Sequence, residues 1–463
     1  MCSALFVEVV NTSFVGHIGN EAMMAGVGMA NMYVNICCLS VLFGINQVLN
    51  TLVSQSYGLG NIKLCGIYFY RSRILITLAL VPMLVVLLNA QLLFDFLGFD
   101  PLASQQSQIY IRLIIPALYL LGLVDSNRRL LSCMGFQNGP MVIQIGTTVM
   151  HIFWCWLLTD QMGMEIRGTA IATCITNLLN LVILHVYTIK YTDERLREIV
   201  GSFPSKESFI VKGLLEYMKL GLPSIGMVCL EWWSFEIMTL FAAYISLTAT
   251  ASQIILLNTA VITFMPALGL QYGGSTLIGQ QIGKQNIAVA KRLRKILQLV
   301  GYCVSITTGL FIYFGRFIIL DFYTTIDEVK DASESVLKFL AFFHQLDAAQ
   351  CINCGVLRGL GKFNQATVMA VLSYYVISLP MEYLIALHWG YGLIGLWYGQ
   401  VCGSIFHVMS TQYLACFHYD WKQIGVEVKE RNDLEEKRLQ EQQAQSGCSQ
   451  DSTKGRCDEI QLV

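Results

Sequence analysis

Long apolar runs recur along this chain as far as Phe417, and they constrain its fold more than any other feature. A bilayer core needs ~20 consecutive apolar residues per helix, and runs of about that length are bounded here by glycine, proline or charge. Only 13% of the residues are charged and 55% are hydrophobic, whereas soluble domains average ~25% charged residues. The sequence therefore predicts an all-α polytopic membrane protein.

We expect about twelve transmembrane helices, each near the length that a bilayer requires. The first is short for a span, so the first helix is expected to be truncated. The predicted helices cover residues 2–15, 24–52, 66–93, 109–133, 140–158, 169–189, 214–247, 251–279, 296–320, 333–357, 367–387 and 392–417.

An internal repeat divides the chain into two halves. The stretch from Gly44 to Asn61 matches the stretch from Gly269 to Asn286, and Gln55 and Gln280 are equivalent within it, 225 positions apart. Two pseudo-symmetric six-helix lobes of the same orientation follow, related by an axis along the membrane normal. The predicted parts are the N-terminal lobe (1–190), a solvated cytoplasmic linker (191–213), the C-terminal lobe (214–419) and a polar tail (420–463). The tail is expected to be disordered, apart from a short surface helix over 427–443, because its apolar content is low.

Lysine and arginine gather in alternate loops, which sets the expected orientation. One set of loops holds clusters such as Lys284 to Lys295 and the pair Arg128 and Arg129, while the other set holds few basic residues. Loops rich in these residues face the cytoplasm. An even number of helices then predicts that both termini are cytoplasmic.

Several classes of chemistry leave no signature in the sequence. There is no G-x-x-x-x-G-K-[ST] motif for ATP, no H-E-x-x-H and no nucleophile elbow. Cys351 and Cys354 form a lone C-x-x-C inside a predicted helix, which we interpret as packing because no second pair accompanies it. We therefore expect no enzyme activity, metal, cofactor or nucleic-acid partner, and an ion gradient as the energy source.

Two acidic residues, Glu231 and Glu236, interrupt the apolar stretch 220–238. A charge in the bilayer core costs at least ~2.5–3.5 kcal/mol, so such residues usually face a cavity and mark a transport path. Five positions on a helix separate the two side chains by ~140°. Pro223 permits a bend that changes this angle. Burial favours the protonated form of a carboxyl group, as a proton carrier requires. A structural carboxyl group, hydrogen-bonded to neighbouring helices, is the alternative for both.

Other polar and aromatic residues fall within predicted spans. Asp347 lies three residues after His344, so the two are able to pair on one helix face, and a functional and a structural role are equally compatible with this. Carboxylates beside aromatic rings suit an organic cation, although amides and tyrosines often only join helices. The expected lining residues of such a cavity are Asn50, Trp232, Trp233, Asn258, Tyr272, Tyr375 and Glu382, the last of which follows Pro380 and equally fits a structural role.

Four motifs resemble the multidrug and toxin extrusion (MATE) transporters in their eukaryotic branch: F-V-G-H-I-G at 14–19, N-T-L-V-S-Q-S-Y-G at 50–58, C-L-E-W-W-S-F-E at 229–236 and G-V-L-R-G-L-G at 355–361. The resemblance implies twelve helices in two lobes and an antiporter that exchanges organic cations, xenobiotics or metabolites for protons. It puts the family's paired seventh-helix glutamates on Glu231 and Glu236, and its tenth-helix acid on Asp347. Asn11 stands where many prokaryotic members carry an aspartate, so coupling is expected through the second lobe.

Three alternatives remain open at this stage. A sodium-coupled antiporter would use the same carboxylates with Asn258 and Thr259 as oxygen ligands. A lipid-linked saccharide flippase would share the two-lobe plan but need a more basic cavity. A non-transporting membrane scaffold is the third. For an antiporter we expect a monomer in the plasma membrane or the vacuolar membrane, with an organic cation and the lipid bilayer as its partners.

Overall fold

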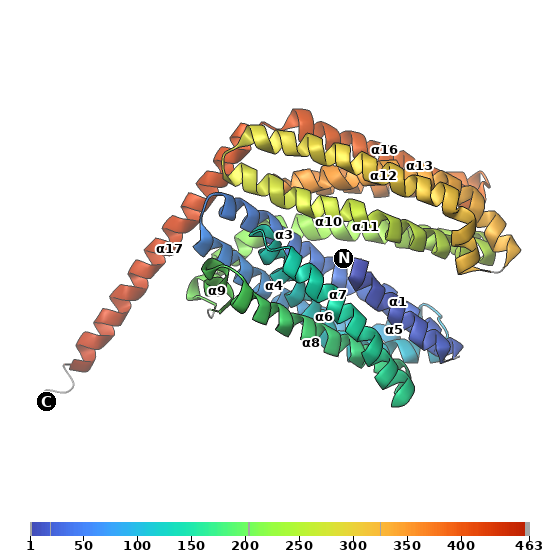
Figure 1. Cartoon of the computed structure of the whole chain (residues 1–463), viewed down its shortest axis with the longest axis horizontal. Helices are drawn as coiled ribbons and strands as arrows, with labels where there is room; N and C mark the ends of the chain where they lie inside the picture. The colour runs from blue at the N-terminus through green and yellow to red at the C-terminus, as the bar shows by residue number, and fades with distance from the viewer. Residues whose placement is uncertain (1, 19, 202–203, 325, 459–463) are drawn as a thin grey trace.

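The chain is almost entirely helical. The computed structural model describes residues 2–18, 20–201, 204–324 and 326–458, and no strand occurs in these ranges. Figure 1 shows two bundles of helices that diverge from one end of the molecule. Every one of the twelve predicted segments corresponds to a helix, so the predicted fold class is confirmed. The last five residues of the predicted tail lie outside the described residues.

The first lobe precedes residue 192. Its helices are α1 (Cys2–His17), α2 (Glu21–Val34), α3 (Ser40–Gly58), α4 (Ile62–Leu88), α5 (Ala90–Phe96), α6 (Pro101–Cys133), α7 (Asn138–Cys155) and α8 (Glu165–Tyr191). A π-helical turn, Asn35–Leu39, joins α2 to α3 into one long span, and another, Trp156–Gln161, extends α7. With 16 residues, α1 is shorter than the other spans, in line with the short first helix predicted.

The second lobe repeats this plan. Its helices are α10 (Val211–Ile245), α11 (Leu247–Gly283), α12 (Ile287–Tyr323), α13 (Asp327–Gly359), α14 (Phe363–Ala370), α15 (Leu379–Glu382) and α16 (Gly392–Tyr413). The π-helical segments Val371–Ser378 and Tyr383–His388 make α14 and α15 parts of one span, and Leu414–His418 extends α16.

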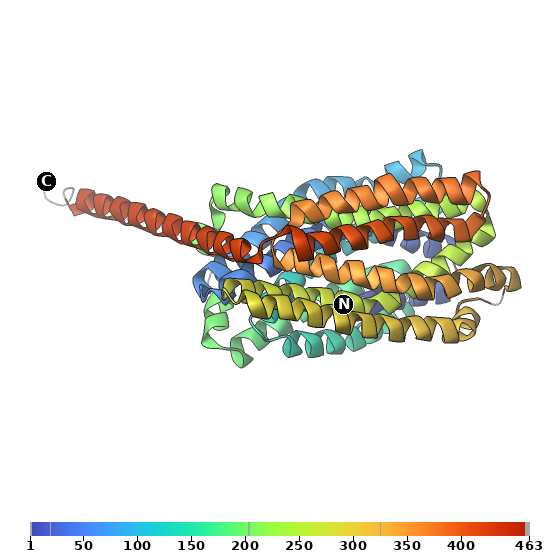
Figure 2. The ribbon, with the colours of Figure 1, turned by 90° about the horizontal axis from the view of Figure 1, so that it is seen from above.

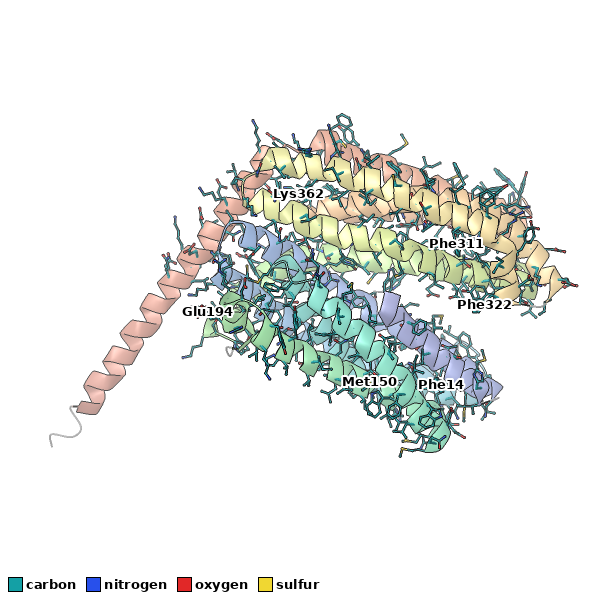
Figure 3. The ribbon with its side chains drawn as sticks, viewed as in Figure 1. Phe14, Met150, Glu194, Phe311, Phe322 and Lys362 are labelled. Carbon is teal, nitrogen blue, oxygen red and sulfur yellow. The ribbon has the colours of Figure 1, made fainter. Side chains whose placement is uncertain are left out.

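The outer surface of the bundle is apolar, as a bilayer requires. Nine helical segments of the described chain are long and apolar enough to cross a membrane. On α12, Phe311, Phe314, Ile318 and Phe322 are all more than 60% exposed. Exposed apolar surface of this extent indicates contact with lipid. Phe311 and Phe322 are marked in Figure 3.

The two lobes end equivalent helices in the same way. Gly135 follows α6 at φ 93° and Gly361 follows α13 at φ 75°, a left-handed conformation that glycine adopts without steric cost. The backbone N–H of Phe136 donates to Leu131 O, and that of Lys362 donates to Leu357 O, at 2.8 and 2.9 Å. These are the hydrogen bonds of a Schellman motif. The repeat detected in the sequence is therefore present in local backbone geometry.

Contacts between the lobes are reciprocal, as a pseudo-two-fold axis requires. Gln55 on α3 donates from Nε2 to Gly359 O at 2.8 Å, and its repeat mate Gln280 on α11 donates to Cys133 O at 2.7 Å. Gly58 lies against the backbone of Gln280, and Gly283 lies against the backbone of Gln55. We call this region, where α3 crosses α11, the joined end.

Further contacts between the lobes come from α10. From α10, the Tyr217 hydroxyl donates to Ile45 O at 2.9 Å and the Ser224 hydroxyl donates to Gly44 O at 2.7 Å. The helices α1 and α2 pack chiefly within the first lobe. Figures 1 and 2 show α17 leaving the bundle from the joined end.

Two segments differ from their predicted state. The linker contains a short helix, α9 (Glu194–Gly201), whose Leu196, Ile199 and Val200 are buried, so it is not fully solvated. The tail forms α17 (Trp421–Asp458) instead of a disordered segment with a short helix. The reason for its first part is that one side of α17 is buried against the bundle as far as Leu439, which supplies packing that the low apolar content of the tail did not predict.

Candidate functional site

The helix α10 carries both predicted glutamates through the middle of the molecule. It runs unbroken past Pro223, whose carbonyl oxygen accepts a hydrogen bond from the Thr367 hydroxyl at 2.7 Å. This contact ties α10 to α14, while Ser224 ties it to α3. Glu231 follows two turns later and is partly buried. These contacts fix the part of α10 that precedes Glu231.

Asp347 on α13 is the acidic neighbour of Glu231. Its side chain is 9% exposed and interacts electrostatically with Glu231. Gln350 bridges Asp347 to the fully buried Tyr374, donating from Nε2 to Asp347 Oδ1 at 2.8 Å and to the Tyr374 hydroxyl at 3.0 Å. Glu231, Asp347, Gln350 and Tyr374 thus form one cluster, which we call the acid cluster.

The nearest cation does not neutralise the acid cluster by pairing. Arg358 follows Asp347 towards the C-terminal end of α13, and it attracts Glu231 electrostatically. Its guanidinium group donates to Gln271 Oε1 at 2.7 Å instead. Within the described residues, neither Glu231 nor Asp347 forms an ion pair. A carboxylate that is buried and unpaired favours a proton or a ligand cation.

Glu236 lies apart from the acid cluster. It is partly buried, and no charged neighbour acts on it among the residues described. This agrees with the ~140° that separates the two glutamates on a straight helix. The structure therefore brings Glu231 and Asp347 together but leaves Glu236 on another side of α10.

Glu382 and His344 are both enclosed in the second lobe. Glu382 is fully buried, and its Oε1 accepts a hydrogen bond from the Ser378 hydroxyl at 3.0 Å. His344 is also buried, but Asp347 hydrogen-bonds to Gln350 rather than to it. The expected pairing of His344 with Asp347 is therefore not seen. His344 and Gln350 each lie three residues from Asp347 on α13, so helical spacing allows either to be its partner.

The remaining predicted residues fall into two groups. Asn50 and Tyr272 join the lobes: Asn50 donates to the Ser275 hydroxyl at 3.3 Å, and the Arg129 guanidinium lies 4.8 Å from the centre of the Tyr272 ring. Trp232 packs edge-on against Phe43 of the first lobe. The less buried residues are Trp233, Asn258 and Tyr375, of which Trp233 is 38% exposed.

Two members of the acid cluster, Gln350 and Tyr374, were not among the predicted site residues. Gln350 stands three residues after Asp347, the spacing of neighbours on one helix face, and this was the available signal. Nothing local links Tyr374 to the cluster, because it comes from another helix. For metals, no group of three or more histidine, cysteine, aspartate or glutamate side chains able to hold an ion is found among the described residues.

Comparison with known proteins gives consistent matches. A family model described as MatE matches residues 1–157 and 223–384. Protein DETOXIFICATION 16 of Arabidopsis thaliana is 30% identical over 415 residues, covering 89% of this chain and 84% of that protein. Multidrug and toxin extrusion protein 1 of Danio rerio is 26% identical and covers 92% and 72%.

Solved structures agree on the fold. The crystal structure of the eukaryotic MATE transporter AtDTX14 has a TM-score of 0.86 at 23% identity, covering 93% of this chain and 95% of that one. The Vibrio cholerae MATE transporter VcmN, as its D35N mutant, has a TM-score of 0.81 at 18% identity, covering 91% and 94%.

Proposed function

This chain belongs to the MatE family of multidrug and toxin extrusion transporters, and from that premise we propose that it exports organic cations in exchange for protons by alternating access. It is an integral membrane transporter of small molecules and not an enzyme. In this proposal Glu231 is the carboxylate that binds and releases the proton. Asp347 interacts electrostatically with Glu231. Glu236 contributes negative charge to the same lobe.

The observation that carries the proposal is the charge balance of the acid cluster. Two carboxyl groups, Glu231 and Asp347, face one guanidinium group, Arg358, which is already hydrogen-bonded elsewhere. Like charges that are close together in a low dielectric repel strongly. The region therefore accommodates one additional positive charge, either a proton or a monovalent organic cation. Competition for one charge couples proton entry to substrate release.

The coupling is energetically sufficient for export. One proton per cycle supplies ~1.36 kcal/mol per pH unit and, when net charge moves, ~2.3 kcal/mol per 100 mV. At ~1.4 kcal/mol per tenfold concentration ratio, these together sustain a substrate gradient of roughly tens- to hundreds-fold.

We propose that the joined end is cytoplasmic. The loops at this end carry Lys63, Lys284 and Lys362, and they belong to the basic set that the positive-inside rule assigns to the cytoplasm. The C-terminal helix α17 then lies in the cytoplasm. A cytoplasmic N-terminus, a monomeric state and the plasma or vacuolar membrane stay predictions.

The test is uptake of a fluorescent organic cation into proteoliposomes under an imposed pH gradient. Glu231→Gln removes the ionisable group at nearly constant size, and we expect loss of the response to the gradient. Glu328→Gln is the matched control, because Glu328 is exposed at the start of α13. Transport by Glu231→Gln equal to that of the control would refute the role of Glu231.

The coupling ion is tested in the same vesicles. Replacing Na⁺ by K⁺ at fixed pH leaves proton-driven uptake unchanged, whereas a sodium-coupled carrier stops. Support for sodium ligands is weak, because Asn258 is exposed and the Thr259 hydroxyl donates to Ile255 O at 2.8 Å.

A further inference from the structure

The first five turns of α17 present one continuous buried face. Its buried residues are Trp421, Ile424, Val428, Asn432, Glu435 and Leu439. Their spacing of three or four positions defines a single stripe along a helix. The residues between them, such as Glu430 and Leu434, are exposed. A tail that was merely solvated would bury none of these side chains.

The start of this face is anchored in the second lobe. Trp421, Ile424 and Val428 join an apolar cluster with residues of α11, α12 and α13. The Trp421 indole N–H donates to Ala415 O at 3.1 Å, and Gln285 Nε2 donates to Gly425 O at 2.8 Å. These contacts are mainly apolar, and they attach α17 directly beside the helix that precedes it.

Further along, the same face crosses to the first lobe. The Ser56 hydroxyl donates to Asn432 Oδ1 at 2.8 Å, and the Arg431 guanidinium donates to Gln55 Oε1. Leu439 joins an apolar cluster that consists mainly of first-lobe residues and also contains Tyr217 of α10. Gln55 is the side chain that also binds Gly359 O of the second lobe. One amide therefore links α3, α13 and α17.

A buried ion pair completes the attachment to the first lobe. Arg71 Nη2 of α4 lies 3.3 Å from Glu435 Oε2, and both side chains are at most 5% exposed. Buried ion pairs add little net stability, because desolvation offsets their attraction, but they are sensitive to loss of one partner. The first-lobe attachment is thus largely polar, and its charges regain hydration when it separates.

We propose that α17 is a clasp that holds the two lobes together at the joined end, and that its Val428–Leu439 portion leaves the first lobe each time this end opens. The proposal rests on the proposed alternating-access function, which requires that α3 and α11 separate here. The helix lies across both lobes where Gly58 and Gly283 bring α3 and α11 into contact. Lys362, whose position is marked in Figure 3, pairs with Glu427 at 2.7 Å and attaches the start of α17 to the second lobe.

The experiment measures the distance between the lobes in the full-length protein. Spin labels are attached through bioorthogonal amino acids at Asn138 and Lys291, which are exposed at the joined end of the first and second lobe. Pulsed EPR then gives the fraction of molecules in which this end is open. We compare wild type with Glu435→Arg, with the charge swap Arg71→Glu/Glu435→Arg, and with the control Glu430→Arg on the exposed side of α17.

We expect Glu435→Arg to raise the ratio of open to closed molecules at least tenfold, because the buried Arg71 loses its carboxylate and meets a second guanidinium group. Breaking a buried pair in this way costs more than the ~1.4 kcal/mol that a factor of ten represents. The charge swap restores the wild-type distribution, and Glu430→Arg leaves it unchanged. A distribution for Glu435→Arg that matches the control, or a failure of the swap to restore it, overturns the proposal.

A second measurement needs no destabilising variant. Hydrogen exchange of the wild-type protein is followed under a pH step that lengthens the distance between the labels. Amides of residues 428–439 lose protection in the open state while those of 421–426 keep it; unchanged protection over 428–439 refutes the clasp. Repeating the distance measurement in Glu231→Gln separates the two proposals, because the clasp response does not depend on which carboxylate carries the proton.

Discussion

Gly283 gives the most direct test of how the lobes close. A Cβ added there would lie 3.0 Å from the Gly58 Cα and closer still to the Gln55 carbonyl oxygen. Both are backbone atoms of α3, so no side chain is free to rotate away. The substitution Gly283→Ala therefore forces α3 and α11 apart in the closed state and leaves the open state unaffected.

The magnitude follows from this geometry. Overpacking by one methyl group against backbone costs ~1–3 kcal/mol, and the higher helix propensity of alanine returns up to ~1 kcal/mol in both states. Because that gain is the same in both states it cancels, and ~1–3 kcal/mol acts on the closed state alone. This corresponds to a shift of roughly 5- to 150-fold toward molecules open at the joined end. Export slows because each cycle must pass through the disfavoured closed state.

The assay pairs this variant with Gly273→Ala in the same helix, where an added Cβ meets no atom within 4 Å. The same propensity gain applies there, so the difference between the two variants isolates the contact with α3. The label pair at Asn138 and Lys291 reports the open fraction. If Gly283→Ala and Gly273→Ala give the same open fraction, then the contact between α3 and α11 does not limit closure.

Three further substitutions test the interior. Asp125→Asn leaves two arginines without the buried carboxylate that pairs with both; we expect a loss of ~3–5 kcal/mol, seen as a lower Tm in detergent. Glu382→Gln keeps the oxygen that accepts from Ser378, so we expect proton-driven uptake near wild type, and its loss would assign Glu382 to coupling. Tyr374→Phe removes the hydroxyl that accepts from Gln350; at ~0.5–1.5 kcal/mol per hydrogen bond, the pH profile of uptake shifts by at most about one unit.

The positions of the helices were predictable because few backbone structures are stable in a bilayer. Backbone groups in lipid must bond within their own helix, so each long apolar run specifies one. The internal repeat also predicted that Gln55 and Gln280 occupy equivalent positions, because similar sequences fold into similar surroundings. The reciprocal hydrogen bonds of these glutamines, with Gly359 and Cys133, are what that symmetry requires.

The docking of α17 and the hydrogen-bond partner of Asp347 could not be predicted from local sequence. Trp421, Ile424 and Val428 form a stripe that average composition conceals, because a docked helix needs apolar side chains on one face only. At Asp347, the choice between His344 and Gln350 depends on Tyr374, which approaches from a different helix. Helical spacing gives the candidate partners, and only tertiary contacts select one.

The helices of the two lobes are arranged alike, but the acidic residues Glu231, Glu236 and Asp347 of the second lobe have no acidic equivalents in the first lobe. At the repeat offset of 225 positions, Glu231 corresponds to Phe6 and Glu236 corresponds to Asn11. For Asp347 the offset is 226 positions, and the equivalent residue is Leu121. None of these carries a charge, and Phe6 is half exposed. The contacts of α3 with α11 are alike in the two lobes, but the acid cluster of Glu231 and Asp347 belongs to the second lobe. If Glu231 carries the proton as proposed, its protonation weakens the attraction of the acid cluster for a cation. One proton per cycle is the stoichiometry that this asymmetry favours.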